Sequence, residues 1–391
     1  MRIALLTHAF PPHGLSGIGR YVEDLAGGLA RLGHEVVVFA VYKNEQEISE
    51  NRSGYRIEWL PDVGNSSSLP FWRLLRLTFR LNSKLKELHR NHAFDVIEAP
   101  NTWAPALAVF WGELRRHTLR VTRLSTPRAW FEQRVPWLPR LTEWLEYLQV
   151  AASDLVISNT RENLELSRRL YPIQNKITHV VYHGIPDPGP PSIIHNQRPP
   201  SILFIGRMEP RKGFDVLAEA WPRVLDAFPT AVLHAVGEDL PGPLDEASFF
   251  EWATRGLTKK QQSQIRYHGK VDDDHRNQLL SSADIVVVPS RYESFGLVIL
   301  EAMAREKPVV ASAAGGMVEI VEDGITGLLV QPEAPGELGD AIVSLLSDDS
   351  RCCSMGKKAR ERMLAHFTVE RMTRASLASY RKAIDGAGTK T

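Results

Sequence analysis

Short apolar runs alternate with longer amphipathic stretches along almost the whole chain, and this alternation is the feature that most limits the fold. Apolar runs of strand length that are bounded by polar or turn-forming residues are typical of buried strands. Strands that alternate with helices favour an α/β fold with parallel sheets. The predicted strands are Arg2–Thr7, Glu35–Ala40, Asp95–Ala99, Leu119–Leu124, Asp154–Ser158, Thr178–Tyr182, Ile202–Gly206, Ala231–Gly237, Ile265–Gly269, Asp284–Pro289, Pro308–Ser312 and Leu328–Val330.

A segment rich in proline and glycine divides the alternation into two halves. It reads GIPDPGPPSIIHNQRPPS, which continues neither a helix nor a central strand. A chain of 391 residues also exceeds what one hydrophobic core usually serves. We predict two doubly wound, Rossmann-like domains at 1–185 and 201–365, with a linker at 186–200. A C-terminal helix and tail, 366–391, are expected to pack back toward the first domain.

Composition limits the partners and the compartment. The chain has 47 Lys and Arg against 46 Asp and Glu, a net charge of +1, so we expect no nucleic-acid partner. Its two cysteines, Cys352 and Cys353, are neighbours, which predicts no disulfide framework and fits a reducing cytoplasm. No apolar run approaches the ~20 residues of a membrane-spanning helix, and the first residues show no signal-peptide pattern. We therefore expect a cytoplasmic protein.

The most informative stretch is VVVPSRYESFGLVILEAMAREKPVVAS, residues 286–312. An apolar strand ends in a polar turn, and a helix is expected to begin around Ser294 and Phe295. Ser294 can cap that helix, which would leave the backbone N–H groups of Phe295, Gly296 and Leu297 to face an anion. Gly296 lets the backbone approach the ligand closely because it has no Cβ atom.

Two glutamates bracket this turn. Along a continuous helix Glu293 and Glu301 would lie ~12 Å apart. Carboxylates accept hydrogen bonds from sugar hydroxyls, so one ligand with a hexose at one end and a ribose at the other could contact both, with phosphates between them. The alternative is an exposed turn and a helix that carry two solvated acids.

A second strand-to-helix turn, ILFIGRMEPRKGFDVLAEA, carries two cations. Arg207 follows the strand and Lys212 stands at the helix entrance, so both can meet one phosphate-rich ligand. Taken alone, a basic turn of this kind is more often solvated surface.

The first strand is followed by a glycine-containing loop, THAFPPHGLSGIGRYVEDL. The spacing of Gly14, Gly17 and Gly19 is not G-x-G-x-x-G, and no acid ends the second strand, which disfavours a nicotinamide enzyme. The backbone N–H of Gly17 could still approach a phosphate or a sugar.

These three blocks, in this order, resemble the retaining glycosyltransferases of family 4, which have the GT-B fold. The resemblance covers nearly the whole chain and is most specific at Glu293–Val330, where two glutamates flank seven residues. It implies two Rossmann-like domains that face each other across a cleft. It further implies that Arg207 and Lys212 hold a donor diphosphate and that Glu301 takes the ribose hydroxyls.

By the same resemblance, Glu293 and the amides of residues 295–297 meet the transferred sugar and the phosphate. Backbone atoms of Lys270 and Val271 border the nucleobase, and the Gly17 loop faces the phosphate. Two departures stand out. Ser125, which with Thr126 marks the acceptor region, occupies the position where this family often has a histidine, and His183–Gly184 replaces an Asn-Gly turn.

The function implied is transfer of a hexose-type sugar from a nucleotide diphosphate sugar to a sugar, lipid-linked or small-molecule acceptor, with retention of anomeric configuration. Arg207, Lys212 and Glu293 are the expected catalytic residues. We expect no cofactor and no metal, because the run Asp272–Asp274 is better explained as a helix N-terminus. The alternatives are a catalytically degenerate module that binds a nucleotide sugar, and a GT-B epimerase or phosphorylase.

Residues 71–92 form a basic amphipathic pattern. One helical stripe holds Leu74, Leu77, Leu81, Leu85 and Leu88, and another holds Arg73, Arg76, Arg80 and Lys84. Two interpretations stay open. The helix could rest on the inner face of an anionic membrane, where a lipid-linked acceptor would lie, or its leucines could pack on the protein's own sheet.

Overall fold

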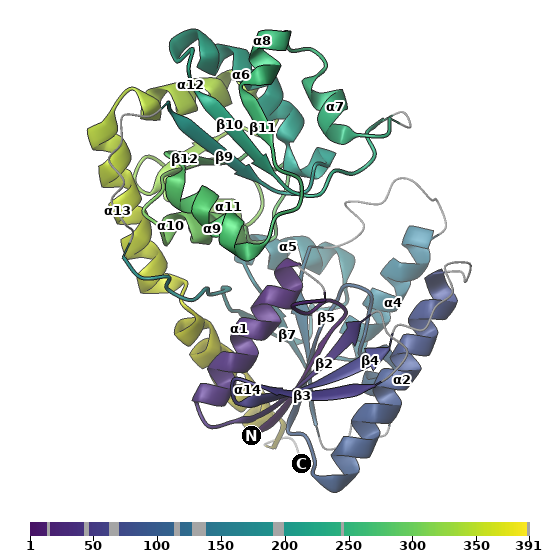
Figure 1. Ribbon diagram of the computed structural model, residues 1–391. Helices are drawn as coiled ribbons and strands as arrows, with labels where there is room; N and C mark the ends of the chain where they lie inside the picture. The colour runs from purple at the N-terminus through teal and green to yellow at the C-terminus, as the bar shows by residue number, and fades with distance from the viewer. Residues whose placement is uncertain are drawn as a thin grey trace. The chain divides into compact units, whose positions relative to one another are not determined.

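The protein is described from a computed structural model that covers residues 1–13, 16–42, 47–61, 70–112, 118–126, 138–190, 199–243 and 246–388. The chain forms two compact units. One comprises Met1–Pro186 together with Val369–Thr391, and the other comprises Asp187–Thr368 (Figure 1). Each unit contains one sheet with helices on both faces, as the alternation of apolar runs predicts.

The first unit has an eight-stranded sheet in the order β3-β4-β2-β1-β5-β6-β7-β8. Neighbouring strands are parallel except for β3 and β4. The bounds are β1 (Arg2–Thr7), β2 (Glu35–Tyr42), β3 (Ile48–Arg52), β4 (Tyr55–Pro61), β5 (Val96–Pro100), β6 (Leu119–Leu124), β7 (Leu155–Ser158) and β8 (Ile177–Val180). Each of the predicted runs in this half overlaps a strand.

The sequence prediction missed the hairpin of β3 and β4. Strand β3 is a polar edge strand, so it has no apolar run to reveal it. The turn between the strands holds Ser53 and Gly54, both with positive φ (48° and 87°). A Ser-Gly dipeptide between two short segments is the signal that could have indicated the hairpin.

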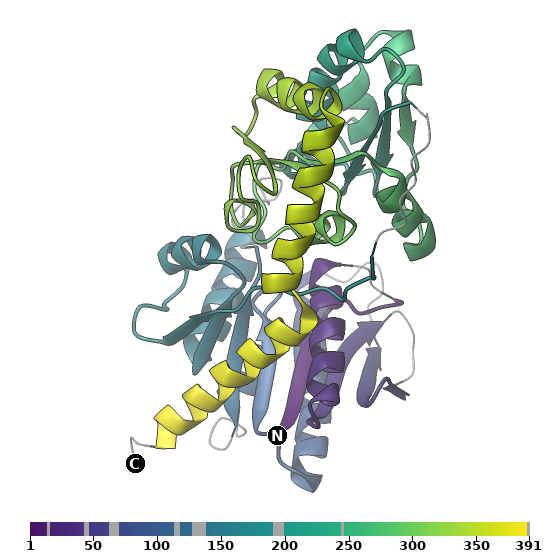
Figure 2. The same cartoon turned by 90° about the vertical axis from the view of Figure 1, so that its left-hand side faces the viewer.

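Helices cover both faces of this sheet. On one face Ile3 and Leu5 of β1 pack against α1 (Gly17–Arg31) and α14 (Val369–Gly388), and α14 lies beside α1 (Figure 2). The other face carries α2 (Pro70–Asn91), α3 (Leu107–Trp111), α4 (Leu138–Ala152) and α5 (Arg161–Leu170). Within the leucine stripe of α2, Leu81, Leu85 and Leu88 are core residues. These three leucines therefore pack on the sheet, as the second interpretation of that stripe expects.

A buried ion pair attaches α14 to the sheet. Arg123 of β6 donates from Nε to Oε1 of Glu98 of β5 at 2.6 Å, and both side chains are 1% exposed. From α14, Tyr380 donates its hydroxyl to Glu98 at 2.5 Å, and Ser376 accepts from Arg123 at 2.9 Å. Breaking such a pair would leave a buried charge without its partner, so α14 is held firmly to the first unit.

His183 is a buried imidazole that follows β8. Its ring stacks on Tyr21 of α1, with the ring centroids 4.8 Å apart and the planes at 16°. The side chain of Asn159 lies 3.5 Å from its Nε2. Burial, with a smaller effect of Arg123, lowers the pKa of His183 to about 3. His183 is therefore neutral in the folded protein at neutral pH.

Replacing His183 with asparagine is expected to change how stability depends on pH. The unfolded state binds a proton at His183 below its ordinary pKa of about 6.5, while the folded state stays neutral down to about 3. Stability therefore falls as the pH drops through this window, by about 1.4 kcal/mol per pH unit for this one group. Urea denaturation between about pH 6 and about pH 4 should show a shallower loss of stability for the variant than for the wild type.

The matched control is His92→Asn, which removes an imidazole that is 70% exposed in the same unit. If both variants follow the wild-type pH profile, His183 does not limit acid stability.

The second unit has a six-stranded, fully parallel sheet in the order β11-β10-β9-β12-β13-β14. The strands are β9 (Ser201–Ile205), β10 (Val232–Val236), β11 (Ile265–Tyr267), β12 (Ile285–Val288), β13 (Val309–Ser312) and β14 (Gly327–Val330). Each predicted run in this half also overlaps a strand, so the predicted α/β class is confirmed for both units.

The helices of this unit lie on both faces of its sheet. The core on one face is formed by α6 (Phe214–Ala227) and α12 (Pro335–Leu346), which contact each other. On the other face lie α9 (Asp273–Ser282), α10 (Leu297–Met303) and α11 (Met317–Ile320) (Figure 1). The remaining elements are η3 (Pro210–Lys212), α7 (Phe249–Thr254), α8 (Lys259–Ser263) and α13 (Asp349–His366). Within the described ranges, no helix is both long and apolar enough to span a lipid bilayer.

Candidate active site

Strands β9 and β12 bring the two charged turns of the second unit together. They pair in parallel, with Leu203 opposite Val286 and Phe204 opposite Val287, so both turns leave the same edge of the sheet. The chain winds outward from β9 through β10 to β11 and then returns to β12 on the other side. Ligands of open α/β sheets bind where the winding reverses in this way.

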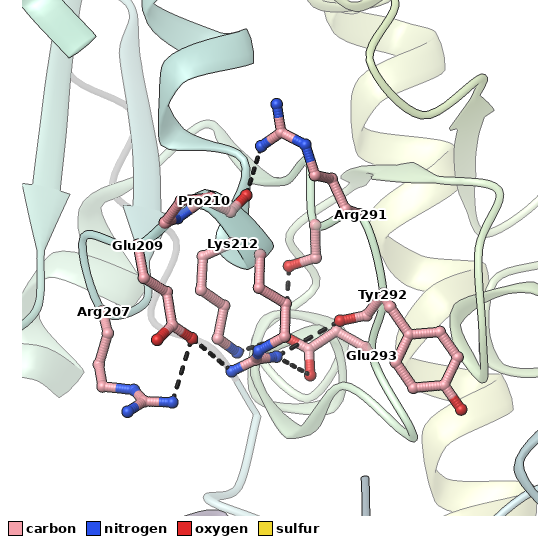
Figure 3. Close-up of polar contacts among 9 residues, drawn as sticks. Arg207, Glu209, Pro210, Lys212, Arg291, Tyr292 and Glu293 are labelled. Atoms are coloured by element: carbon pink, nitrogen blue, oxygen red, sulfur yellow. Dashed lines mark hydrogen bonds and ion pairs between the residues drawn. The ribbon is translucent and has the colours of Figure 1, made fainter. Parts of the chain in front are cut away.

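A carboxylate held by two cations lies at this edge. One oxygen of Glu293, in the turn after β12, contacts Nζ of Lys212 and accepts from the Ser290 hydroxyl at 3.2 Å. The other oxygen lies 3.4 Å from the guanidinium of Arg211. The Glu293 side chain is only 12% exposed. Figure 3 shows Lys212 and Glu293 pointing toward each other from the two turns.

The cluster continues through Glu209. One of its oxygens accepts from Arg207 at 3.1 Å and from Arg211 at 2.7 Å (Figure 3). Glu209 and Arg211 are largely buried, but the Arg207 side chain is 51% exposed. The cluster thus holds three cations, Arg207, Arg211 and Lys212, and two carboxylates, Glu209 and Glu293. Within these five residues one positive charge is in excess. The edge is suited to attract an anion, although the chain as a whole is almost neutral.

The protonation states follow from this arrangement. Burial raises the pKa of the Glu293 carboxyl group, but Lys212 and Arg211 lower it by more, so it lies below its usual value. Burial also lowers the pKa of the Lys212 ammonium group, and Glu293 opposes this effect. Glu293 is therefore ionised at neutral pH and can accept hydrogen bonds.

The backbones of the two turns are in direct contact. Gly213 has φ +71°, and a Cβ atom there would overlap the carbonyl oxygen of Pro289. The backbone N–H of Arg291 donates to the carbonyl oxygen of Arg211 at 2.8 Å. The guanidinium of Arg291 also forms two hydrogen bonds of 2.8 and 2.9 Å with Asp215. These contacts fix the distance between Lys212 and Glu293.

The predicted helix start at Ser294 is wrong. Helix α10 begins at Leu297, and its N-cap is Gly296, with φ +108° and no side-chain cap hydrogen bond. Ser294 and Phe295 precede the helix and are buried, and the ring of Phe295 packs edge-on against Phe367 with centroids 6.1 Å apart. Only glycine accepts this left-handed cap without strain. The ~12 Å spacing of the two glutamates, which assumed a continuous helix, therefore does not apply.

Glu301 lies inside α10 and has a partner that the sequence did not reveal. Its carboxylate contacts the guanidinium of Arg276 from α9, and the two side chains are 9% and 15% exposed. Lys270 and Val271 lie between β11 and α9. The run that begins at Asp272 starts α9, because the Asp272 side chain accepts from the backbone N–H of His275 at 2.8 Å. The prediction of a helix N-terminus at this run is confirmed.

The remaining predicted site residues belong to the first unit. Gly17 is the first residue of α1, and the side chain of Ser16 caps that helix by accepting from Gly19 N–H at 3.0 Å. Gly14 lies outside the described residues. Ser125 follows β6 and donates from its backbone N–H and its hydroxyl to Asn101 at 2.7 and 2.9 Å. Thr126 comes next and is half-buried.

Ser125 belongs to a polar network that sequence reasoning missed. Its hydroxyl contacts that of Thr102. Asn101 donates to Tyr171 at 3.1 Å and to the buried carboxylate of Glu146 at 3.3 Å. The network holds the loops that follow the adjacent strands β5 and β6. It places the half-buried hydroxyls of Ser125 and Thr102 at the ends of these strands.

Two described residues of the charged cluster, Glu209 and Arg211, were also missed. Both lie in the turn quoted for Arg207 and Lys212, but the contact of Arg211 with Glu293 depends on the pairing of β9 with β12. No local pattern marks Arg276 either, since its partner Glu301 comes from another helix. Sequence reasoning finds residues at turns but not which of them meet.

Comparison with known proteins decides the family. Residues 16–184 match the model of the glycosyl transferase 4-like domain, and residues 199–348 match that of the glycosyl transferases group 1. A D-inositol 3-phosphate glycosyltransferase from Kribbella flavida is 32% identical over 394 residues, which cover 94% of this chain and 91% of the relative. The chain belongs to the group 1 glycosyltransferases.

Other relatives share the whole length of this glycosyltransferase. A glycogen synthase from Mycobacterium tuberculosis is 28% identical over 409 residues, covering 99% of this chain and 96% of the relative. The structure of a sucrose-phosphate synthase from Thermosynechococcus elongatus matches with a TM-score of 0.81 and 25% identity, over 98% of this chain and 99% of that chain. The fold of this glycosyltransferase is therefore GT-B, as the resemblance of its motifs implies.

Gly213→Ala should disturb this site without touching a charged residue. A side chain at φ +71° costs about 1–3 kcal/mol, and the overlap with Pro289 adds to that cost. We expect the melting temperature to fall by several degrees and sugar transfer to fall with it, because the two turns are pushed apart. Differential scanning calorimetry and an activity assay measure the two effects.

Gly256→Ala is the matched control in the same unit, since a Cβ atom there meets nothing within 4 Å. Equal melting temperatures and equal activities of the two variants would show that the contact between the turns affects neither stability nor sugar transfer.

Proposed function

We propose that this glycosyltransferase belongs to the retaining enzymes of family 4. It would move a hexose-type sugar from a nucleotide diphosphate sugar to a carbohydrate, lipid-linked or small-molecule acceptor. The observation that carries the proposal is the cluster of three cations and two carboxylates at the β9 and β12 strand ends. Cations can bind a diphosphate, and an ionised carboxylate beside them can accept hydrogen bonds from sugar hydroxyls.

The proposal assigns the donor diphosphate to Arg207 and Lys212. Half of the Arg207 side chain is exposed, so its planar guanidinium has N–H groups that can reach a phosphate. Lys212 is more buried, at 18% exposed, where water screens its charge less. The excess positive charge of the cluster favours an anionic ligand.

The remaining site residues take their roles from the same proposal. Glu293 would bind hydroxyls of the transferred sugar, and Glu301 would bind those of the ribose. The amides of Phe295, Gly296 and Leu297 would lie near the phosphate. Lys270 and Val271 would border the nucleobase. Gly17 would contact the donor from the first unit, and Ser125 and Thr126 would bind the acceptor.

The reaction follows from where charge develops. As the bond from the anomeric carbon to the phosphate breaks, negative charge grows on the leaving diphosphate, and Arg207 and Lys212 would stabilise it. Glu293, ionised between two cations, would hold the sugar by its hydroxyls while that carbon gains positive character. The leaving phosphate would help to deprotonate the acceptor hydroxyl. The proposal requires neither a metal nor a cofactor.

The relatives support a polyhydroxylated acceptor. They include a glycogen synthase and a D-inositol 3-phosphate glycosyltransferase, whose names refer to a polysaccharide and to a cyclic polyol. The half-buried hydroxyls of Ser125 and Thr102 can exchange hydrogen bonds with such an acceptor.

Binding of the donor can be tested without knowledge of the acceptor. UDP-, GDP- and ADP-sugars are added separately, and the melting temperature is followed, since a ligand that binds only the folded state raises it. We expect one nucleotide family to stabilise the wild type and to have a much smaller effect on Arg207→Ala. Lack of any shift in the wild type would contradict a preformed donor site.

Single alanine variants of Lys212, Glu293 and Arg207 test the assigned roles. Each should lower kcat by about 10²–10³, the usual cost of removing a group that stabilises developing charge. Arg255→Ala is the control, because it removes an arginine that is 64% exposed in the same unit. Product NMR gives the anomeric configuration, and retention is expected. Near-normal turnover of all three variants, or an inverted product, would refute the assignment.

A further inference from the structure

The outer surface of the first unit carries a concentration of exposed aromatic side chains. Ten large hydrophobic residues are exposed in the described part of the chain, and the aromatic ones are Phe79, Trp111, Trp144 and Tyr147. Their exposed fractions are 63%, 54%, 56% and 42%. All four lie on α2, α3 or α4, and none lies elsewhere in the described ranges. Clustered exposure of this kind marks an interaction surface.

The three helices form one continuous layer. Helix α3 contacts both α2 and α4, and Figure 1 shows α2 and α4 on the same flank of the unit. The indole N–H of Trp111 donates to the carbonyl oxygen of Leu148 in α4 at 3.2 Å. Next to Trp111, Gly112 lies beside the side chain of Asn82 in α2. The four rings therefore belong to one surface, which we call the aromatic surface.

Helix α4 carries apolar side chains on both its buried and its exposed side. Its inner face buries Leu145 and Val150 together with the polar Thr142, Glu146 and Gln149. Its outer face holds Trp144 and Tyr147, together with the half-buried Leu148, which follows Tyr147 in the sequence. A surface helix usually turns polar residues outward. Packing against the sheet explains the apolar residues on the inner face only. The exposed aromatic residues on the outer face therefore require another explanation.

Positive charge lies beside these rings. Residues 70–91, which form α2, include six Lys and Arg and one Glu, whereas the whole chain has a net charge of only +1. Arg76 and Arg80 are exposed and lie three residues before and one residue after Phe79, on the outward side of α2. The helix leucines that are core residues lie on its opposite side.

We propose that the aromatic surface, with Arg76 and Arg80, docks on the interface of an anionic lipid bilayer. Trp and Tyr rings prefer the headgroup level of a membrane, because one end of the ring is apolar and the other is polar. Arginines at the edge add attraction to anionic headgroups. This positive charge favours a bilayer over a neutral protein partner. The proposal concerns membrane binding and stands apart from the proposed sugar transfer.

Co-sedimentation with vesicles tests the proposal. The full-length protein is mixed with vesicles of phosphatidylcholine alone, or of phosphatidylcholine and phosphatidylglycerol. We expect it to pellet with the anionic vesicles and to dissociate as salt is raised. The double variant Arg76→Gln/Arg80→Gln should bind about 30-fold more weakly, from the loss of two basic residues near the surface. Trp144→Ser/Tyr147→Ser should weaken binding by at least about tenfold.

The matched control is Leu32→Ser/Ile177→Ser, which removes two side chains of the same unit that are 43% and 40% exposed but not aromatic. It should bind vesicles like the wild type. All variants should keep their melting temperature and their donor-induced thermal shift, so a failure here is separable from a failure of the donor site.

Three results would overturn the proposal. The first is failure of the wild type to pellet with anionic vesicles at any salt concentration. The second is a loss of binding in the control as large as that in the aromatic variant. The third is a dimer in sedimentation equilibrium that Trp144→Ser/Tyr147→Ser dissociates, which would make the aromatic surface a contact between two copies of the chain.

Discussion

The parallel pairing of β9 with β12 is the constraint on which the candidate site depends. Lys212 and Glu293 lie far apart in the chain and meet because their strands are neighbours that end at the same edge. The contact between Gly213 and Pro289 then sets how close the two turns can come. A change in the strand order would separate the cation from the carboxylate, whatever the sequence of the turns.

Local charge, not net charge, determines what each part of this enzyme can bind. The chain carries nearly equal numbers of acids and bases, yet they are unevenly distributed. In the cluster at the β9–β12 edge, the three cations Arg207, Arg211 and Lys212 meet two carboxylates. Ions near that edge are desolvated and interact more strongly than ions on open surface. On α2 the charges of Arg76 and Arg80 remain exposed, where salt screens them.

The first unit uses buried polar groups for two different purposes. The pair of Arg123 with Glu98 is almost inaccessible and joins α14 to the sheet through Tyr380 and Ser376. The network of Asn101 and Ser125 instead ends in half-buried hydroxyls at the strand ends. The first arrangement stabilises the unit, and the second leaves groups that can exchange hydrogen bonds with a ligand.

The sequence by itself determined the α/β class, the predicted strands and the turns that carry Arg207, Lys212, Glu293 and Glu301, because apolar periodicity and turn chemistry are local properties of the chain. It placed the N-terminus of α9 correctly for the same reason. It misplaced the start of α10, since the left-handed conformation of Gly296 competes with Ser294 as a cap.

Only the tertiary structure decided which charges meet. Arg211 and Arg276 became visible as partners of Glu293 and Glu301 once the strands and helices were assembled. It also decided which apolar residues are core. Leu85 and Trp144 both lie in amphipathic helices, yet one is buried and the other is 56% exposed. Which face of a helix meets a sheet depends on long-range packing, and residue type alone does not specify it.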